Sequence, residues 1–171
     1  MKVLIVVDMQ NDFIDGTLGT DEAVKIVPNV VKKIKEFDGI VLSIRDTHFE
    51  EYLQTQEGKN LPIKHCIKNS FGWEIRKEVA ELLKEEPIDK LSFGSIELAD
   101  KLKELNSKEK IESITFIGLC TDICVISNAI IAKASLPEVP IIVDSNCCAG
   151  VTVKNHLQAL EVMKGCQIQI I

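Results

Sequence analysis

The chain has 171 residues, of which 46% are hydrophobic, and carries a formal net charge of -6 at pH 7. A chain of this length can bury one substantial core and is too short to divide into two, so we expect a single domain over residues 1–171. Proteins that bind nucleic acids usually present a basic surface that neutralises phosphates, so the net negative charge of this chain argues against nucleic-acid binding.

The N-terminal residues do not have the pattern of a signal peptide. The run MKVLIVVD has one basic residue, and its short apolar stretch ends at Asp8. No other segment approaches the length of a membrane span, so we expect no association with membranes. Without an export signal, cysteines are expected to be free thiols, and we predict a cytoplasmic protein. The thiols are Cys66, Cys120, Cys124, Cys147, Cys148 and Cys166.

The first half of the chain alternates apolar runs with polar segments. Residues 2–7 are continuously apolar after Lys2 and rich in β-branched residues, which is typical of a strand covered on both faces. A loop rich in Asn, Asp and Gly follows, and Pro28 is predicted to begin an amphipathic helix. A second strand is predicted over residues 40–44. Residues 49–70 lack periodicity, as expected of a functional or disordered loop.

The second half continues the alternation of strands and helices. The predicted elements are a helix over residues 73–85, a short strand over 88–91, a helix capped by Ser95, a strand over 114–117 that breaks at Gly118, a helix carrying Cys124, a strand ending at Asp144, a helix over 152–164 and a strand over 167–171. Strands and helices that alternate with short links indicate an α/β fold, with a parallel sheet covered by helices on both faces.

Three polar residues stand at the carboxyl ends of predicted strands, where sheets of this type carry their sites. Asp8 follows the first strand, Lys90 lies at the third and Cys124 follows the fourth. In this combination the thiol is a nucleophile, the carboxylate moves its proton to a leaving amine, and both the ammonium and the helix start favour the thiolate. Taken singly, Cys124 is also consistent with buried packing and Lys90 with a surface lysine.

A second cluster combines one carboxylate with two imidazoles. Asp46 and His48 are two residues apart at the end of a predicted strand, so they point to the same side, and a long loop can bring His65 to them. Such a set suits zinc, iron or manganese and leaves coordination positions open. The alternative is a pair of loop histidines that hydrogen-bond to carboxylates.

Four separated motifs resemble those of one known family. The segment VVDMQNDF, Lys90 before a Phe-Gly turn, and GLCTDICV are similar to the cysteine hydrolases of the isochorismatase-like superfamily. The segments DTH at 46–48 and KHC at 64–66 look like its nicotinamidase branch. The resemblance covers nearly the whole chain. It implies a six-stranded parallel sheet of Rossmann-like order, the isochorismatase-like hydrolase fold, in a homo-oligomer.

The resemblance also implies a catalytic arrangement. Asp8, Lys90 and Cys124 would form a catalytic triad. A cis peptide bond between Leu119 and Cys120 would let the amides of Cys120 and Cys124 form an oxyanion hole.

It further implies a metal site and a substrate pocket. Asp46, His48 and His65 would hold a divalent metal, with zinc expected first and iron or manganese as alternatives. Phe13 matches the aromatic residue that packs on the substrate ring in nicotinamidases, and Trp73 is a second candidate neighbour of that ring.

The sequence departs from nicotinamidases near the predicted metal ligands. Those enzymes usually carry Trp-His-Pro after the metal aspartate, whereas this chain has THF at 47–49. They usually have Pro-Asp-His-Cys where this chain has IKHC at 63–66. We expect hydrolysis of a small primary amide through a thioester, releasing ammonia and then the acid, with nicotinamide as the first candidate substrate.

Two other functions remain open from the sequence. A related cysteine hydrolase would act on another small amide or an N-carbamoyl compound, and its metal site would be empty or irrelevant to turnover. A non-catalytic redox or ligand-binding protein would use Cys120, Cys124 or the Cys147–Cys148 pair, and it would show reversible thiol oxidation without amide turnover.

Overall fold

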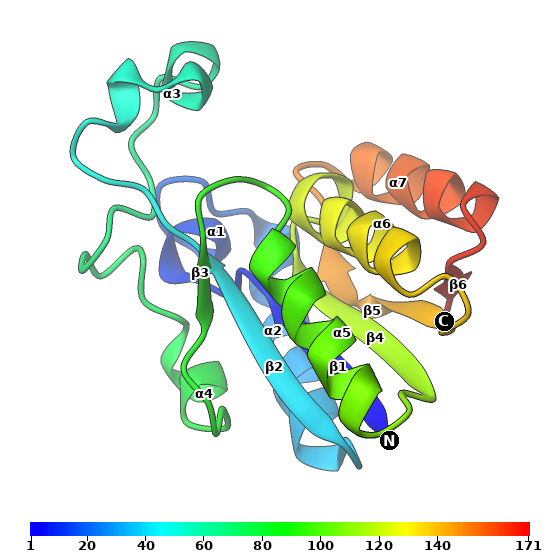
Figure 1. The fold of residues 1–171 in the computed structure, drawn as a ribbon. Helices are drawn as coiled ribbons and strands as arrows, with labels where there is room; N and C mark the ends of the chain where they lie inside the picture. Colours follow the sequence, from blue (N-terminus) through cyan, green and yellow to red (C-terminus); the bar gives the residue numbers. More distant parts are fainter.

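The computed structural model describes all residues from 1 to 171 and contains a six-stranded sheet (Figure 1). The strands are β1 (Lys2–Val7), β2 (Ile40–Asp46), β3 (Ile88–Lys90), β4 (Ser113–Leu119), β5 (Ile141–Ala149) and β6 (Gln169–Ile170). Their order is β3-β2-β1-β4-β5-β6 and every pairing is parallel. The predicted α/β fold with a Rossmann-like sheet is therefore confirmed.

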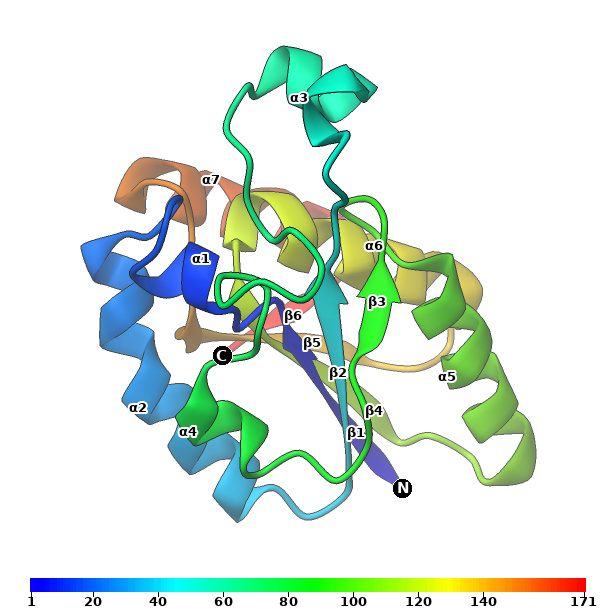
Figure 2. The ribbon, with the colours of Figure 1, turned by 90° about the vertical axis from the view of Figure 1, so that its left-hand side faces the viewer.

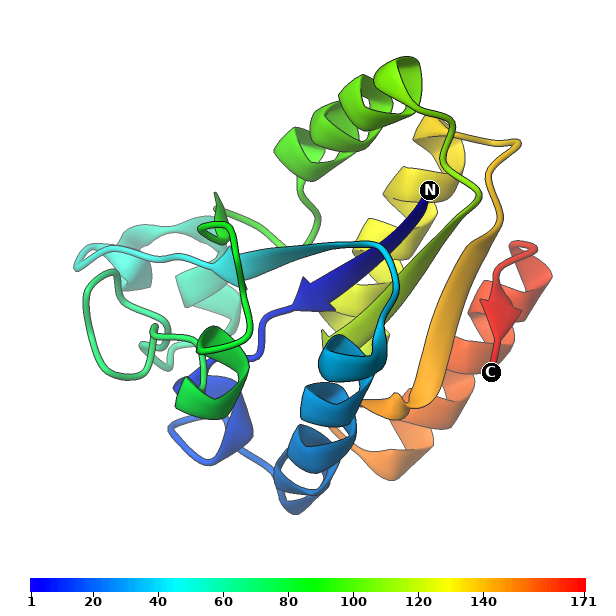
Figure 3. The ribbon, with the colours of Figure 1, turned by 90° about the horizontal axis from the view of Figure 1, so that it is seen from below.

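Helices cover both faces of the sheet, as predicted (Figure 3). The longer ones are α2 (Asp21–Glu36), α5 (Ile96–Lys108), α6 (Ile126–Ser135) and α7 (Val153–Gly165). The short ones are α1 (Asn11–Ile14), η1 (Tyr52–Gln54), α3 (Gln56–Asn60), α4 (Lys77–Ala80) and η2 (Thr121–Val125). None of these helices combines the length and apolar character that crossing a bilayer demands.

The central strand β1 divides the apolar core into two layers. Val3, Ile5 and Val7 pack with residues of α5, α6 and α7 on one face. Leu4 and Val6 pack with residues of α2 and α4 on the other. Side chains alternate across a strand, so an unbroken apolar run is what a strand needs when both of its faces are covered. The rigid centre of the sheet therefore ends at Asp8.

Helix α2 begins seven residues before the predicted start. The Thr20 side chain accepts a hydrogen bond from the Ala23 amide at 3.1 Å, and the acidic residues Asp21 and Glu22 occupy the first turn. These are strong start signals, because they satisfy orphan amides and complement the helix dipole. Pro28 lies inside the helix. The prediction that Pro28 begins the helix was therefore wrong.

Other differences concern element lengths. The helix expected over residues 73–85 is reduced to α4, and the segment 49–70 contains η1 and α3. Figure 2 shows α3 projecting beyond the carboxyl ends of β2 and β3. Strand β4 continues through Gly118, and β5 continues past Asp144 with a register shift against β4. The predicted Ser95 cap is confirmed, since its hydroxyl accepts from the Leu98 amide at 3.1 Å.

Gly118 is required where β4 runs beside β1. Its φ is +116°, in a region that side chains rarely adopt, and a Cβ there would collide with the Val7 carbonyl oxygen. We predict that Gly118→Ala lowers the free energy of unfolding by at least about 2 kcal/mol, because backbone strain of about 1–3 kcal/mol adds to the collision. Urea denaturation measures this change.

Gly165→Ala is the matched control, because nothing lies within 4 Å of its added Cβ. This variant should change the free energy of unfolding by no more than about 1 kcal/mol. Equal stability of the two variants would contradict the assignment of strain to Gly118.

Candidate active site

The carboxyl ends of four strands bring most of the predicted site residues together. Asp8 follows β1 directly, and Asp46 and Lys90 are paired final residues of β2 and β3. Cys124 lies on η2, which follows β4 and leads into α6. Parallel strands end on the same edge of the sheet, so residues distant in sequence meet there.

Lys90 lies at the centre of this group. Its Nζ is 2.9 Å from Asp8 Oδ2, 3.1 Å from Asp46 Oδ1 and 3.5 Å from Cys124 Sγ, and it also donates to the Ser92 carbonyl at 3.1 Å. The Lys90 side chain is 1% exposed. A buried ammonium ion is tolerated only when it is paired, and here two carboxylates and a carbonyl supply the pairing.

Burial and the neighbouring charge of Asp8 raise the pKa of the Cys124 thiol well above its ordinary value, whereas Lys90 lowers it, as the sequence predicts. Desolvation is the largest of these effects. Burial likewise raises the pKa of Asp8 to about 6, although Lys90 lowers it.

The Asp8 carboxylate retains capacity to accept a proton. Both of its oxygens are buried and make no aligned hydrogen bond, so the 2.9 Å contact with Lys90 is an ion pair of poor hydrogen-bond geometry. Asp8 Oδ2 and Cys124 Sγ both contact Lys90 Nζ, at 2.9 Å and 3.5 Å, so the thiol lies close to the carboxylate. A thiol proton therefore has a short path to this carboxylate.

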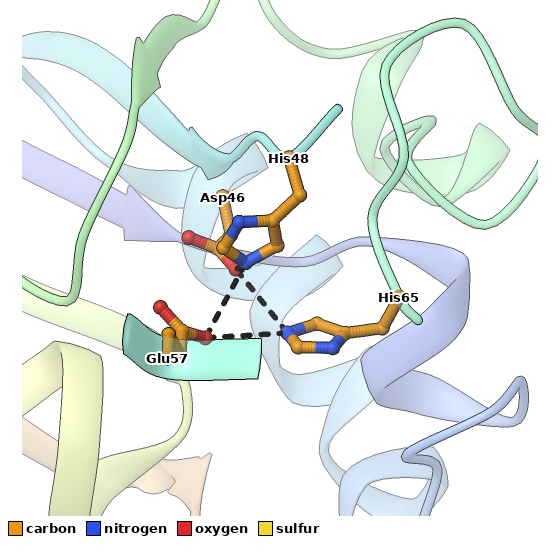
Figure 4. Close-up of side chains that lie close together, drawn as sticks. All are labelled: Asp46, His48, Glu57 and His65. Carbon is orange, nitrogen blue, oxygen red and sulfur yellow. Dashed lines mark ion pairs between the residues drawn. The ribbon is translucent and has the colours of Figure 1, made fainter. Parts of the chain in front are cut away.

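A second cluster shares Asp46 with the first, and Figure 4 shows its four side chains. His48 Nε2 is 2.9 Å from Asp46 Oδ2 and 3.4 Å from Glu57 Oε1. His65 Nε2 is 3.6 Å and 3.7 Å from the same two oxygens. One ligand atom from each of these four residues lies within 4.8 Å of the other three. The structure thus brings the three predicted metal ligands together and adds Glu57.

The protonation and burial of these side chains fit a metal ion. His65 Nδ1 lies 2.8 Å from the Ile63 carbonyl, which can only accept, so Nδ1 carries a hydrogen and Nε2 is the nitrogen that faces the cluster. His48 Nε2 is buried without an aligned hydrogen bond. Two imidazole nitrogens and two carboxylate oxygens are a donor set that zinc accepts.

The charges of the cluster also attract a cation. Burial alone would lower the pKa of His48, but the carboxylates of Asp46 and Glu57 raise it to about 9. Burial alone would raise the pKa of Asp46, but His48, His65 and Lys90 lower it. Without a metal, a proton on His48 balances the carboxylates, and a divalent ion would compete with that proton.

Sequence reasoning missed Glu57 because it lies in the segment without periodicity. A usable signal was Thr55, whose hydroxyl accepts from the Gly58 amide at 3.0 Å and caps α3. A capped turn between His48 and His65 places an acidic residue in its first turn, where it can face the two imidazoles.

A cavity of about 310 Å³ connects the two clusters. Cys124 borders it together with Asp46, Glu57 and His65, and its walls are mostly hydrophobic. The further lining residues are Phe13, Leu18, Thr20, Ala23, Leu61, Phe93, Leu119, Cys120, Ile123 and Val151, so that no lysine or arginine lines it. The Phe13 ring lies in this wall, with its centroid 5.6 Å from that of His65.

The Leu119–Cys120 peptide bond is cis, as the resemblance implies. The Cys120 amide donates to no acceptor within the chain. Cys120 borders the cavity beside Cys124, so an unpaired backbone donor lies close to the thiol.

Trp73 does not line the cavity. Its indole N–H donates to Thr47 Oγ1 at 2.8 Å, and the guanidinium carbon of Arg45 lies 3.6 Å from the ring centroid. The Trp73 ring therefore packs against Arg45 and Thr47, outside the cavity. The expected position of Trp73 beside a substrate ring is therefore corrected.

Solved structures resemble the chain over nearly its full length. The pyrazinamidase of Pyrococcus horikoshii in complex with zinc is 27% identical, with a TM-score of 0.81 and coverage of 99% of this chain and 98% of that one. The pyrazinamidase/nicotinamidase of Streptococcus mutans is 25% identical, with a TM-score of 0.83 and full coverage of both chains. The N-carbamoylsarcosine amidase of Thermoplasma acidophilum is 27% identical, with a TM-score of 0.75 and coverage of 99% and 95%.

These similar proteins are all amidohydrolases. The family described as "Isochorismatase domain" matches residues 2–171. The chain therefore belongs to the isochorismatase family, among members that hydrolyse amides.

Proposed function

We propose that this protein is a cysteine-dependent amidase that converts a small neutral ring amide, with nicotinamide as the first candidate, to its acid and ammonia. The observation that carries this proposal is the shared cavity: the Cys124 thiol and the Asp46, Glu57 and His65 cluster open onto one small apolar space. This space can hold a ring amide with its carbonyl carbon at the thiol and its ring between the apolar walls.

Asp8 and Cys124 act as a base and nucleophile pair. As Cys124 Sγ attacks the amide carbon, its proton passes to the Asp8 carboxylate, and the carbonyl oxygen becomes an oxyanion. Asp8 then gives the proton to the leaving nitrogen, ammonia departs, and a thioester remains. Water attacks the thioester with Asp8 again accepting a proton, which returns to the sulfur as the acid leaves. A carboxyl pKa of about 6 suits both directions of transfer.

The magnitudes explain why a protonated thiol is compatible with catalysis. Lowering a thiol pKa increases the thiolate population but also weakens the nucleophile, so the net gain is small. Proton transfer to a positioned carboxylate contributes about 10²- to 10⁴-fold. Each oxyanion donor contributes about 10²- to 10³-fold. The unpaired Cys120 amide, with that of Cys124, supplies the donors in this proposal.

The charges of the cavity favour a neutral ring amide. An N-carbamoyl amino acid carries a carboxylate, and the cavity lining offers no lysine or arginine to pair it. The volume of about 310 Å³ suits a small ligand, and Phe13 offers an aromatic face. A divalent metal held by Asp46, His48, Glu57 and His65 would supply Lewis acidity and a coordination position for a ring nitrogen.

Ammonia release tests the proposed reaction. We expect turnover of nicotinamide, with loss of at least about 10⁴-fold in Cys124→Ala because the nucleophile is removed. The matched control is Cys147→Ala, which removes a buried thiol that does not line the cavity and should retain activity. In the wild type, kcat/KM should fall below about pH 6 as Asp8 is protonated.

An N-carbamoyl amino acid and an aliphatic amide complete the substrate panel. Turnover of the carbamoyl compound without turnover of nicotinamide would overturn the substrate class. Full activity in Cys124→Ala would overturn the cysteine mechanism.

Alkylation by iodoacetamide tests the electrostatics of Cys124. The Asp8 charge raises the pKa of the Cys124 thiol, so Asp8→Asn should lower that pKa and speed alkylation. The expected gain is about threefold for each unit by which the pKa falls, because a thiolate of lower pKa is more abundant but less nucleophilic. The Lys90 ammonium lowers the thiol pKa, so Lys90→Met should slow alkylation. Peptide mapping separates Cys124 from the exposed Cys166. Rate changes of the same sign in both variants would contradict this arrangement.

Zinc titration tests the role of Glu57. Removing one of four ligands in Glu57→Ala should weaken zinc binding at least about 10-fold. The control Glu51→Ala removes an exposed carboxylate from the same segment and should bind zinc as the wild type does. Equal affinities in both variants would exclude Glu57 from the metal site.

A further inference from the structure

Three consecutive polar residues after β1 have no role in the reaction proposed above. Gln10, Asn11 and Asp12 follow catalytic candidate Asp8 by only a few residues, and Gln10 and Asn11 are buried. Buried polar side chains are hydrogen-bonded, so their partners reveal what they hold in place. Each of the three bonds to the backbone of a different part of the segment from 46 to 76.

Gln10 holds both backbone polar groups of Asp46. Its Nε2 donates to the Asp46 carbonyl at 2.8 Å, and its Oε1 accepts from the Asp46 amide at 2.7 Å. The pairing of β1 with β2 ends at Val7 and Ile44, so Asp46 has no strand partner on that side. The Gln10 side chain replaces the missing strand and fixes the backbone from which the Asp46 carboxylate projects.

The same Gln10 side chain reaches a third group. Nε2 also donates to the Trp73 carbonyl at 2.9 Å, which ties the returning segment to the same point. Both N–H groups and the oxygen of the Gln10 side-chain amide are therefore bonded to backbone groups.

Asp12 holds the backbone beside His65. Its Oδ2 accepts from the Cys66 amide at 2.8 Å, and its own amide donates to the Gly72 carbonyl at 2.9 Å. A Cβ on Gly72 would collide with the Asp12 carboxylate, so the carboxylate fits closely under that backbone. His65 is 3% exposed, and its ring direction depends on where this backbone lies.

We infer that Gln10 and Asp12 are positioning residues for the metal site, each fixing the backbone of one ligand from the end of β1. Asp46 and His65 reach the cluster from different segments (Figure 4), and this short stretch joins them to one rigid point. Outer-shell partners of this kind orient metal ligands, and their loss typically weakens metal binding by about 10- to 100-fold. The inference rests on the proposed metal site.

Asn11 provides a matched control. Its Nδ2 donates to the Phe71 carbonyl at 2.8 Å, in the same segment but beside no proposed ligand. Asn11→Ala, Gln10→Met and Asp12→Ala each remove hydrogen bonds from one side chain of this stretch. A merely structural role predicts that zinc affinity follows the loss of thermal stability in all three variants.

The experiment titrates zinc into metal-free protein and records the Tm of the metal-free forms. We expect Gln10→Met and Asp12→Ala to bind zinc about 10- to 100-fold more weakly than the wild type, and Asn11→Ala to stay within about threefold. Asp12→Asn keeps an acceptor for the Cys66 amide and should recover most of the affinity. Gln10→Glu keeps the acceptor but loses the donors, and it replaces Gln10→Met if that variant does not fold.

The outcomes separate this inference from the proposals on which it rests. Wild-type affinity in folded Gln10 and Asp12 variants, or an equal loss in Asn11→Ala, would overturn the positioning role alone. A wild-type protein that binds no zinc would overturn the metal site itself. Absence of amide turnover in a wild type that binds zinc would overturn the proposed reaction and leave the positioning role intact.

Discussion

The buried ammonium group of Lys90 is the interaction on which the site depends. Asp8 and Asp46 are both buried at the ends of neighbouring strands, and two carboxylates placed there without a cation would repel and pay the full cost of desolvation. Lys90 pairs with both and reaches Cys124 as well. Lys90 therefore compensates the two carboxylates that the neighbouring strand ends bring together.

The fold supplies the geometry that this pairing needs. The central strand has both faces covered, so its carboxyl end is held firmly, and β2, β3 and β4 end beside it. Residues from four strands then meet without help from long loops. The segment from 49 to 70 adds Glu57 and His65 from outside the sheet, which completes the proposed metal site and one wall of the cavity.

Much of this arrangement follows from the sequence, and the exceptions have physical causes. Apolar runs that stop at Asp8 and at Arg45, one residue before Asp46, indicate strand ends, and parallel strands bring such ends together. Glu57 was not predicted as a metal ligand, because a short helix in an aperiodic loop leaves little hydrophobic pattern in the sequence. The raised pKa of Cys124 could not be predicted because desolvation depends on three-dimensional packing.

Asp46 divides its two oxygens between two chemical centres, with Oδ1 on Lys90 and Oδ2 on the imidazoles. An amide in its place would offer only one acceptor oxygen and could not serve both. The two centres are therefore coupled through one side chain. A substitution that removes this carboxylate takes a partner from Lys90 and a proposed ligand from the metal site together, so a single change at position 46 disturbs both.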